Sequence, residues 1–200
     1  QYRVQRRTDK VMYILFTGAP GSRWSSVVES IYRSPDVDQS DSASDRIYDK
    51  GQVKHMGSYF DPGMEFDNSR ENWDKPFSGK GKRIIKSHTF AHQLDELKTF
   101  GYPIVLVLRS HLECYDWWVE AGGFDISYPN YSHFENLDKM KIHIKKQNVD
   151  INQFILANIE RITCPIDNFD LCDLLGIKSP GRQNRIHNYA ERDTKVYVYR

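Results

Sequence analysis

Three short stretches of the chain carry residue types that bind and transfer anionic groups. The first is the glycine- and serine-rich turn Thr17–Ser26, the second is Lys86-Ser87-His88, and the third is Arg109-Ser110. Guanidinium and ammonium groups bind phosphate and sulfate oxygens. A histidine, with a reference pKa of about 6.5, accepts a proton near neutral pH. These residue types therefore suit the transfer of an anionic group to a hydroxyl or an amine.

Each stretch lies at the end of a segment that predicts a strand, and the first and third of these segments are hydrophobic runs. Val11–Phe16 precedes the turn, Lys82–Lys86 leads into the histidine, and Ile104–Leu108 is the most hydrophobic segment of the chain. Short apolar runs of this kind are typical of strands buried on both faces and are too short to span a membrane. The sequence therefore places each candidate side chain at or just beyond the end of a strand.

Helical periodicity separates these strands. One helix is expected directly after the first turn. Further helices are expected at about residues 90–100, 112–119 (closed by Gly122-Gly123), 132–147, 152–162 and 168–175. Residues 195–199 alternate between apolar and polar side chains like a strand. The alternation predicts one three-layer α/β domain over residues 1–200, with a mainly parallel central sheet flanked by helices. A P-loop-like strand–turn–helix opens this domain. Ligands bind such sheets at the carboxyl ends of the strands, so the three stretches are expected to lie along one edge.

The first turn favours an anion site because it joins a strand to the start of a helix. Backbone N–H groups at a helix N-terminus lack intrahelical acceptors and attract anions. Two glycines would let the backbone approach a phosphate or sulfate, and three serines would add donors. These residues are Gly18, Gly21, Ser22, Ser25 and Ser26. The turn is not a Walker A motif, because Trp24 stands where that motif has its lysine.

The composition of the chain restricts the classes of partner and the cellular location that are expected. The net charge of +1, with 28% charged residues, gives no overall field that favours nucleic acid or an anionic membrane. Cys114, Cys164 and Cys172 are an odd number of cysteines without metal-ligand spacing, which predicts reduced thiols in a cytoplasmic protein. No signal peptide or membrane-spanning segment is recognised.

The three stretches together resemble the nucleotide-dependent sulfotransferase family, whose donor is 3′-phosphoadenosine 5′-phosphosulfate (PAPS). Ala19–Trp24 lies at the place of the family's 5′-phosphosulfate loop, and Lys86-Ser87-His88 is similar to the K-T-H motif that supplies a catalytic histidine. Val105–Ser110 is similar to the strand that ends in a 3′-phosphate-binding arginine. A weaker similarity links Asp170–Gly176 to a helix near the family's C-terminus.

The resemblance implies transfer of a sulfuryl group from PAPS to a hydroxyl or amine, which leaves 3′,5′-adenosine bisphosphate and requires no metal. His88 would be the general base, and Lys86 and Arg23 would stabilise the transferred charge. Arg109 would bind the 3′-phosphate. The other implied contacts to the nucleotide are Ala19, Pro20, Gly21, Ser22, Trp24, Ser25, Ser26, Ser110 and Arg182. A small-molecule, carbohydrate or peptide acceptor is the expected partner, and the oligomeric state is not indicated.

The sequence departs from the family pattern at several positions. Gly21 stands at the place of the loop lysine, and Arg23, two residues further on, is the proposed substitute because of its charge and position. Trp117 stands where a 3′-phosphate serine is expected. The C-terminal R-K-G element is echoed by Gly181-Arg182. Trp24 and other aromatic residues are expected to stack on the adenine.

Other interpretations remain open. A P-loop-like kinase of a small molecule or nucleotide would share the strand–turn–helix, and a non-catalytic domain that binds a phosphorylated ligand would explain the departures. His88 can be a satisfied polar residue, Arg109 can pair with a carboxylate, and His88 with His92 suggests a metal site. The acidic run Asp36–Asp45 is expected to be a solvated surface.

Overall fold

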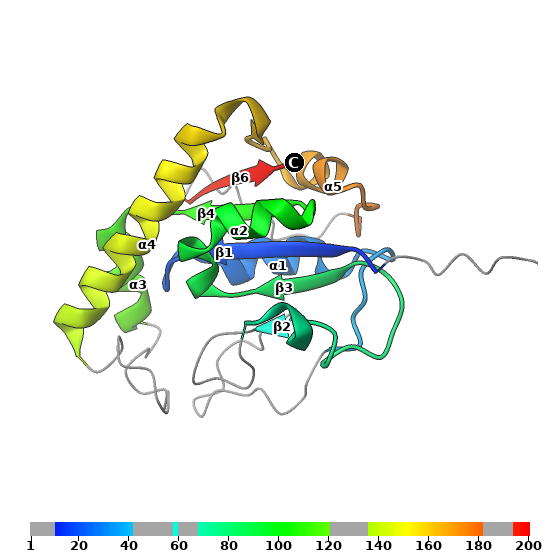
Figure 1. Ribbon diagram of the computed structural model, residues 1–200, viewed down its shortest axis with the longest axis horizontal. Coiled ribbons are helices and arrows are strands. Elements are labelled where there is room, and N and C mark those ends of the chain that lie inside the picture. The colour runs from blue at the N-terminus through cyan, green and yellow to red at the C-terminus, as the bar shows by residue number, and fades with distance from the viewer. Residues whose placement is uncertain (1–10, 42–57, 60–67, 121–135, 182–193) are drawn as a thin grey trace, which may run out of the picture.

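The computed structural model describes residues 11–41, 58–59, 68–120, 136–181 and 194–200. These residues form an α/β fold with an open, mixed, six-stranded sheet that is flanked by helices (Figure 1). The strands are β1 (Tyr13–Gly18), β2 (Ser58–Tyr59), β3 (Arg83–Lys86), β4 (Ile104–Leu108), β5 (Ile162–Thr163) and β6 (Lys195–Tyr199). The helices are α1 (Trp24–Tyr32), α2 (Leu94–Leu97), α3 (His111–Glu120), α4 (Leu137–Ala157) and α5 (Asn168–Leu175). None of the helices in the described ranges is long and apolar enough to cross a membrane.

The order of the strands is β2-β3-β1-β4-β6-β5. β1 pairs in parallel with β3 and β4, and β2 pairs in parallel with β3. β6 runs antiparallel to both of its neighbours, β4 and β5. The register pairs Lys195 with Leu108, so the last strand enters at the carboxyl end of β4 and runs back along it. The sheet is therefore mixed, where the sequence predicts a mainly parallel one.

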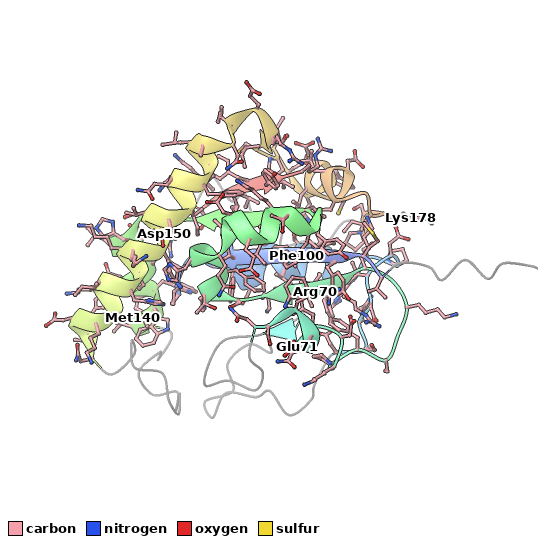
Figure 2. The ribbon with its side chains drawn as sticks, viewed as in Figure 1. Arg70, Glu71, Phe100, Met140, Asp150 and Lys178 are labelled. Atoms are coloured by element: carbon pink, nitrogen blue, oxygen red, sulfur yellow. The ribbon has the colours of Figure 1, made fainter. Side chains whose placement is uncertain are left out.

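α4 is one continuous helix where the sequence predicts two. The patterns near 132–147 and 152–162 merge into Leu137–Ala157, a helix of 21 residues that includes Met140 and Asp150 (Figure 2). Its N-cap is Asn136, whose side chain accepts a hydrogen bond from a backbone amide of the first turn. No glycine or proline interrupts residues 137–157, so nothing local ends the helix between the two patterns.

Two other predicted helices have different outcomes. The segment 90–100 forms three short turns, which are η2 (His88–His92), α2 and η3 (Lys98–Phe100), and it ends at Gly101 with φ of +73°. The helix predicted at 168–175 is confirmed as α5, and Gly176 ends it in the left-handed conformation. The expected stop of α3 at Gly122-Gly123 lies outside the described residues.

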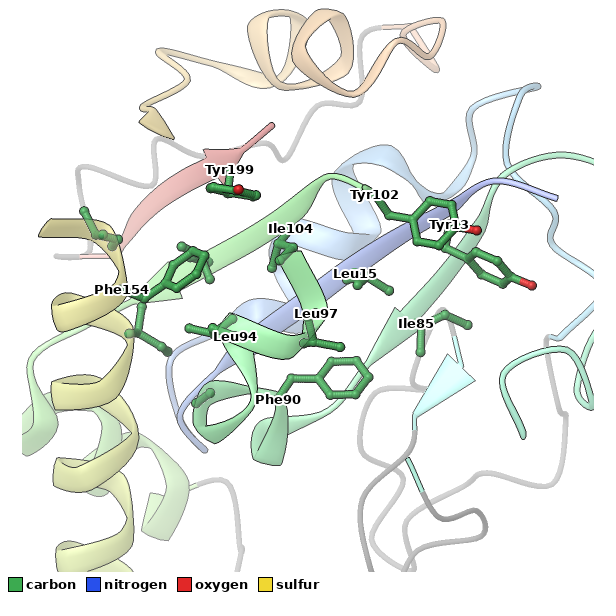
Figure 3. Close-up of a cluster of buried hydrophobic side chains, with 14 of the residues drawn as sticks. Tyr13, Leu15, Ile85, Phe90, Leu94, Leu97, Tyr102, Ile104, Phe154 and Tyr199 are labelled. Atoms are coloured by element: carbon green, nitrogen blue, oxygen red, sulfur yellow. The ribbon is translucent and has the colours of Figure 1, made fainter. Parts of the chain in front are cut away.

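Helices bury the central strands from both sides, which explains their unbroken apolar runs. Every residue of β1 and of β4 is buried. One face of the sheet packs against α2 and α4 around Leu15, Phe90 and Phe154 (Figure 3). The other face packs against α1 and α5 around Phe16 and Ile31. The rigid sheet therefore fixes the carboxyl ends of β1, β3 and β4.

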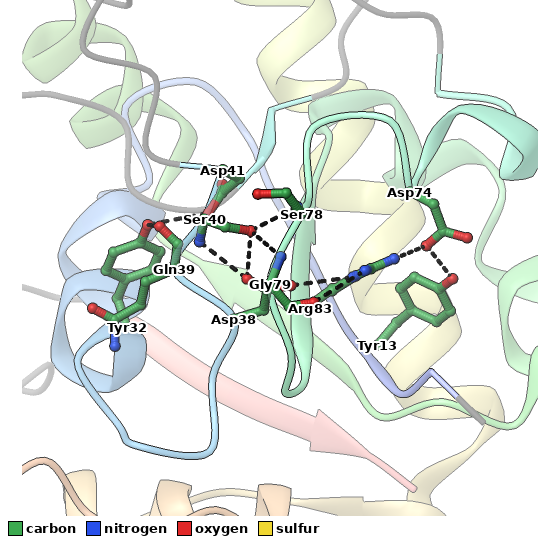
Figure 4. Close-up of polar contacts among 10 residues, drawn as sticks. All are labelled: Tyr13, Tyr32, Asp38, Gln39, Ser40, Asp41, Asp74, Ser78, Gly79 and Arg83. Atoms are coloured by element: carbon green, nitrogen blue, oxygen red, sulfur yellow. Dashed lines mark hydrogen bonds and ion pairs between the residues drawn. The ribbon is translucent and has the colours of Figure 1, made fainter. Parts of the chain in front are cut away.

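The described part of the acidic run is not a solvated surface, contrary to the expectation. Asp38 is 2% exposed, accepts a hydrogen bond from Ser40 Oγ at 2.6 Å and pairs with Arg83 (Figure 4). Arg83 also pairs with Asp74, which accepts a hydrogen bond from Tyr13. We call Tyr13, Asp38, Ser40, Asp74 and Arg83 the amino-end network, because it joins the amino ends of β1 and β3. Residues 42–45 of the run lie outside the described residues.

Candidate functional site

The carboxyl ends of β1, β3 and β4 lie side by side, because β1 pairs with both of the other strands. His88 follows β3, and its Nδ1 lies 2.5 Å from the carbonyl oxygen of Gly18 at the end of β1. Arg109 follows β4, and its Nη1 donates to the carbonyl oxygen of Gly21 at 3.3 Å. The structure thus brings the three predicted stretches together. We call this region the carboxyl-edge site.

The ring of His88 is held from two directions. A carbonyl oxygen only accepts, so Nδ1 carries the hydrogen and, in the neutral ring, Nε2 carries the lone pair that takes up a proton. The indole of Trp24 stacks on the imidazole, with ring centroids 3.9 Å apart and planes 13° apart. His88 is 6% exposed. These contacts fix the tautomer and the ring plane of a general base, and they equally satisfy a structural histidine.

Trp24 is only 4% exposed, which disagrees with the expectation that it stacks on adenine. One face of its ring is occupied by the imidazole of His88. The ammonium of Lys86, which is fully buried, lies 5.7 Å from the centroid of the same indole. A buried ammonium is stabilised by an aromatic face. Trp24 is therefore an internal support for both predicted catalytic side chains of the second stretch.

The loop glycines are required by contacts within the protein. A Cβ on Gly21 would lie 1.8 Å from the carbonyl oxygen of Cys114 in α3, and φ of Gly21 is +79°. A Cβ on Gly18 would lie 2.6 Å from Oγ of Ser22. These contacts account for the glycines at both positions, and the close approach of an anion to their backbone amides stays a prediction. The family's loop lysine has no room at position 21, because any side chain there would collide with α3.

Cys114, which packs beneath the loop, is a buried structural thiol. Burial raises its pKa to about 12, so it stays protonated and is not a nucleophile near neutral pH. Burial likewise raises the pKa of Cys172 to about 11. All three cysteines of the chain carry free thiols, and Cys164 is exposed.

Two guanidinium groups meet around one indole beside the loop. The guanidinium of Arg23 lies 4.4 Å from the ring centroid of Trp117 in α3, and that of Arg109 lies 6.0 Å from the same centroid. Among the described residues, Arg23 is the one non-glycine residue with positive φ, at 68°. Strained backbone of this kind concentrates at functional sites. Trp117 is 38% exposed, so this ring is accessible to a ligand while Trp24 is not.

Sequence reasoning considered Trp117 only as a replaced serine. A usable signal was present, because Trp117 lies off the apolar pattern that the sequence has at positions 112, 115, 118 and 119, although the structure buries only Trp118 of these four. A large aromatic residue on the polar face of a helix is a candidate for binding.

Arg109 is also engaged by a carboxylate. Its Nη2 pairs with Glu113, one turn along α3, at 2.9 Å, and its side chain is 9% exposed. The alternative that Arg109 pairs with a carboxylate is therefore confirmed. Glu113 is 49% exposed and lies at the surface, so the carboxylate and an incoming anion can compete for the same guanidinium.

Three buried polar atoms beside the site have no hydrogen-bond partner among the described residues. They are Oγ of Ser22, Oε1 of Gln147 and Oδ1 of Asn148. The two amides reach the site from α4, where Gln147 Nε2 donates to the His88 carbonyl at 2.9 Å and Asn148 Nδ2 donates to the Arg109 carbonyl at 2.7 Å. No sequence motif marked these amides. α4 therefore fixes the backbone at both strand ends and brings unsatisfied acceptors to the same region.

The remaining predicted residues differ in exposure. Ala19 and Pro20 are buried, Ser25 is half-buried, and Ser26 and Ser110 are exposed. Ser87 caps η2 by accepting a hydrogen bond from the Thr89 amide at 3.2 Å. Arg182 lies outside the described residues.

His92 pairs with a carboxylate of α4 and not with His88. Its Nδ1 pairs with Asp150 of α4 at 2.5 Å, and Lys146 pairs with the same carboxylate. Burial alone would raise the pKa of Asp150, but the hydrogen bonds from Lys146 and His92 outweigh it and lower the pKa. In the described ranges, no group of three or more metal-ligating side chains is found.

Comparison of the chain with models of known protein families, with curated proteins and with solved structures finds no match. The resemblance to the sulfotransferases therefore depends on the three strand-end motifs and on how the fold arranges them.

Proposed function

We propose that this chain is a PAPS-dependent sulfotransferase, which transfers a sulfuryl group from PAPS to a hydroxyl or amine acceptor. The observation that supports it most is the meeting of three strand ends at the first turn. His88 and Arg109 come from different strands, and each contacts a backbone carbonyl of the loop. The parallel order β3-β1-β4, with the glycine turn leading into α1, also supports the P-loop-like strand–turn–helix that the sequence predicts.

His88 is the general base of the proposed reaction. Its Nε2 takes the proton of the acceptor hydroxyl while the acceptor oxygen forms its bond to sulfur. The hydrogen bond from Nδ1 to the Gly18 carbonyl holds the ring in place and favours the protonated imidazolium that results. A positioned base of this kind contributes about 10²- to 10⁴-fold to the rate.

Lys86, Arg23 and the N-terminal amides of α1 stabilise the charge that moves. As the sulfuryl group leaves, negative charge develops on the phosphate oxygen of the departing 3′,5′-adenosine bisphosphate. Oγ of Ser22 is 0% exposed and has no partner among the described residues, so it suits a hydrogen bond to these oxygens. Preorganised donors in a buried site are each worth about 3–4 kcal/mol to the transition state.

Arg109 and Trp117 suit the adenosine 3′-phosphate end of the donor. The guanidinium of Arg109 offers several N–H donors in one plane, so it can share them between Glu113 and a phosphate. The partly exposed ring of Trp117 lies beside both Arg109 and Arg23 and provides a flat surface for the adenine. Trp117 thus takes the part that the sequence assigned to Trp24.

The decisive experiment compares thermal stability with 3′,5′-adenosine bisphosphate and with magnesium-ATP. The bisphosphate should stabilise the protein by about 2.7 kcal/mol at a hundred times its Kd, and magnesium-ATP should not. His88→Asn should keep this binding but lose nearly all sulfuryl transfer from PAPS to a panel of acceptors. Arg23→Ala should weaken binding and slow transfer. Preferential stabilisation by magnesium-ATP would favour a kinase instead.

A non-catalytic nucleotide-binding domain is the second candidate. The observation that favours it is the enclosure of the reacting groups, since His88 is stacked beneath Trp24 and Arg109 pairs with Glu113. Stabilisation by the bisphosphate, together with no transfer by the wild-type chain to any acceptor of a broad panel, would support this candidate over the enzyme.

A further inference from the structure

A cavity of about 570 Å³ lies at the end of β4, next to the carboxyl-edge site. It is open to solvent and is bordered by the β4–α3 connection, one face of α4 and the start of β6. Its lining residues are Leu108, Arg109, Ser110, His111, Lys145, Asn148, Val149, Asn152, Lys195 and Tyr197. The volume is in the range of pockets that hold small organic ligands. We call it the β4-end cavity.

The lining is cationic. No aspartate or glutamate is among the lining residues, whereas Arg109, Lys145 and Lys195 are. The charge of Arg109 is balanced by Glu113, so the net positive charge comes from the two lysines. These lysines belong to different elements, α4 and β6, and both are exposed. Neither ammonium forms an ion pair with a described residue, so the described part of the lining carries positive charge and favours an anion.

The neutral part of the lining suits hydroxyl groups. Asn148 is 7% exposed, and its Oδ1 is a buried acceptor with no partner among the described residues. An acceptor of this kind is satisfied by an O–H or N–H donor, which a simple inorganic anion lacks. Asn152, Ser110 and the phenol of Tyr197 add further polar groups to the wall. A ligand with both hydroxyl groups and negative charge therefore fits better than a purely apolar one.

The cavity is coupled to the proposed transfer site. Arg109 and Asn148 belong to both, and Asn148 donates to the Arg109 carbonyl. The adjacent residue of α4, Gln147, donates to the carbonyl of His88. A molecule anchored in the cavity would thus lie beside the carboxyl end of β4, one helix residue from the amide that binds the His88 carbonyl.

We propose that the β4-end cavity binds the sulfuryl acceptor, and that this acceptor is an anionic, hydroxyl-rich molecule of the acidic-sugar class. Lys145 and Lys195 bind its carboxylate or sulfate groups, and Asn148 accepts from one of its hydroxyls. The role as acceptor rests on the proposed sulfotransferase function, whereas anion binding by the cavity does not.

The test measures calorimetric binding of tetragalacturonate, with cellotetraose as a neutral oligosaccharide of the same length. The acidic sugar should bind more tightly than the neutral one, and its affinity should fall as salt rises from about 0.05 M to about 0.5 M. The Lys145→Gln/Lys195→Gln variant should bind it about tenfold more weakly or worse. The control variant Lys75→Gln/Lys80→Gln removes the same charge from exposed positions outside the cavity and should bind like the wild type.

Equal binding of the acidic and neutral sugars, or equal losses in the two double variants, would overturn the assignment of the cavity. A titration in saturating 3′,5′-adenosine bisphosphate separates acceptor from donor. Retained binding of tetragalacturonate supports an acceptor site, and competition overturns it by assigning the cavity to the nucleotide. If the bisphosphate itself does not bind, the proposed sulfotransferase function fails, while the variant comparison still decides whether the cavity binds acidic sugars.

Discussion

The two ends of the sheet handle buried polar groups in opposite ways. At the amino end, the buried Asp38 and the half-exposed Asp74 are each bound by Arg83, and Ser40 and Tyr13 complete the network. At the carboxyl end, Oγ of Ser22 and the two amide oxygens from α4 have no partner among the described residues.

This difference indicates a structural role for the amino end and supports the binding role proposed for the carboxyl end. A buried polar atom without a partner costs about 1–3 kcal/mol, whereas a paired one contributes to stability. The amino-end network therefore needs no ligand. The carboxyl-edge site retains groups that are unfavourable in the unliganded protein, and this is expected where a ligand supplies the missing partners.

The largest loss of stability is expected from a substitution of Gly21 at the carboxyl end of the sheet, and Gly101 at the amino end provides its control. Gly21→Ala combines φ of +79° with a Cβ 1.8 Å from a backbone oxygen, and we expect it to lower the free energy of unfolding by about 3–5 kcal/mol. Gly101 precedes β4 at the amino end, has φ of +73° and has no atom within 4 Å of its added Cβ. Gly101→Ala should therefore cost only about 1–2 kcal/mol. Urea unfolding measures the loss of unfolding free energy in both variants. Equal losses would show that the loop is not in close contact with α3.

The next effect is expected in the amino-end network. Arg83→Met removes the cation that pairs with Asp38, whose side chain is 1% exposed, and we expect a loss of about 3 kcal/mol in unfolding free energy. The control is Lys98→Met, because Lys98 pairs with Asp95 at the surface and should contribute less than about 1 kcal/mol. A small loss in Arg83→Met would mean that this network is not structural.

A smaller change in stability is expected when a serine is replaced by alanine at each end of the sheet. Ser40→Ala removes a hydroxyl that binds Asp38 and accepts from the Ser78 and Gly79 amides, and it should cost about 1–2 kcal/mol. Ser22→Ala removes an unpartnered hydroxyl, so the unfolding free energy should stay the same or rise by up to about 1 kcal/mol.

Binding should show the reverse pattern in these two serine variants. Ser22→Ala is expected to weaken the binding of 3′,5′-adenosine bisphosphate by about tenfold, and Ser40→Ala should leave the Kd of this ligand unchanged. Urea unfolding and calorimetric titration provide the two readouts. A Ser22→Ala variant that loses stability and keeps its affinity would contradict the distinction between the two ends.

The smallest effect is expected in how the free energy of unfolding depends on pH in acid. Burial alone would raise the pKa of Asp74, but hydrogen bonds from Tyr13 and Arg83 outweigh it and lower the pKa. A lowered folded-state pKa contributes stability above the unfolded value, near pH 4, and this contribution is lost as the pH falls through the folded pKa. Asp74→Asn should therefore flatten the fall in unfolding free energy below about pH 4. The exposed Asp116→Asn is the control, and an equal flattening there would contradict the assignment.

The sequence by itself determined the elements that depend on local order. The apolar runs of β1 and β4, the short strand β3 and the glycine-stopped α5 follow from side-chain patterns and from turn residues, which act over a few neighbouring positions. The positions of Lys86, His88 and Arg109 at or just beyond strand ends follow from the same pattern, and parallel pairing then brings those ends to one edge.

The tertiary structure alone decided which side chains meet. Trp24 stacks on His88, Asp38 pairs with Arg83, and the amides of Gln147 and Asn148 reach carbonyls of distant strand ends. Such contacts join residues far apart in the chain, so no local pattern contains them. Packing decided whether each polar group found a partner, and with it which end of the sheet keeps the unpartnered atoms on which the proposed site depends.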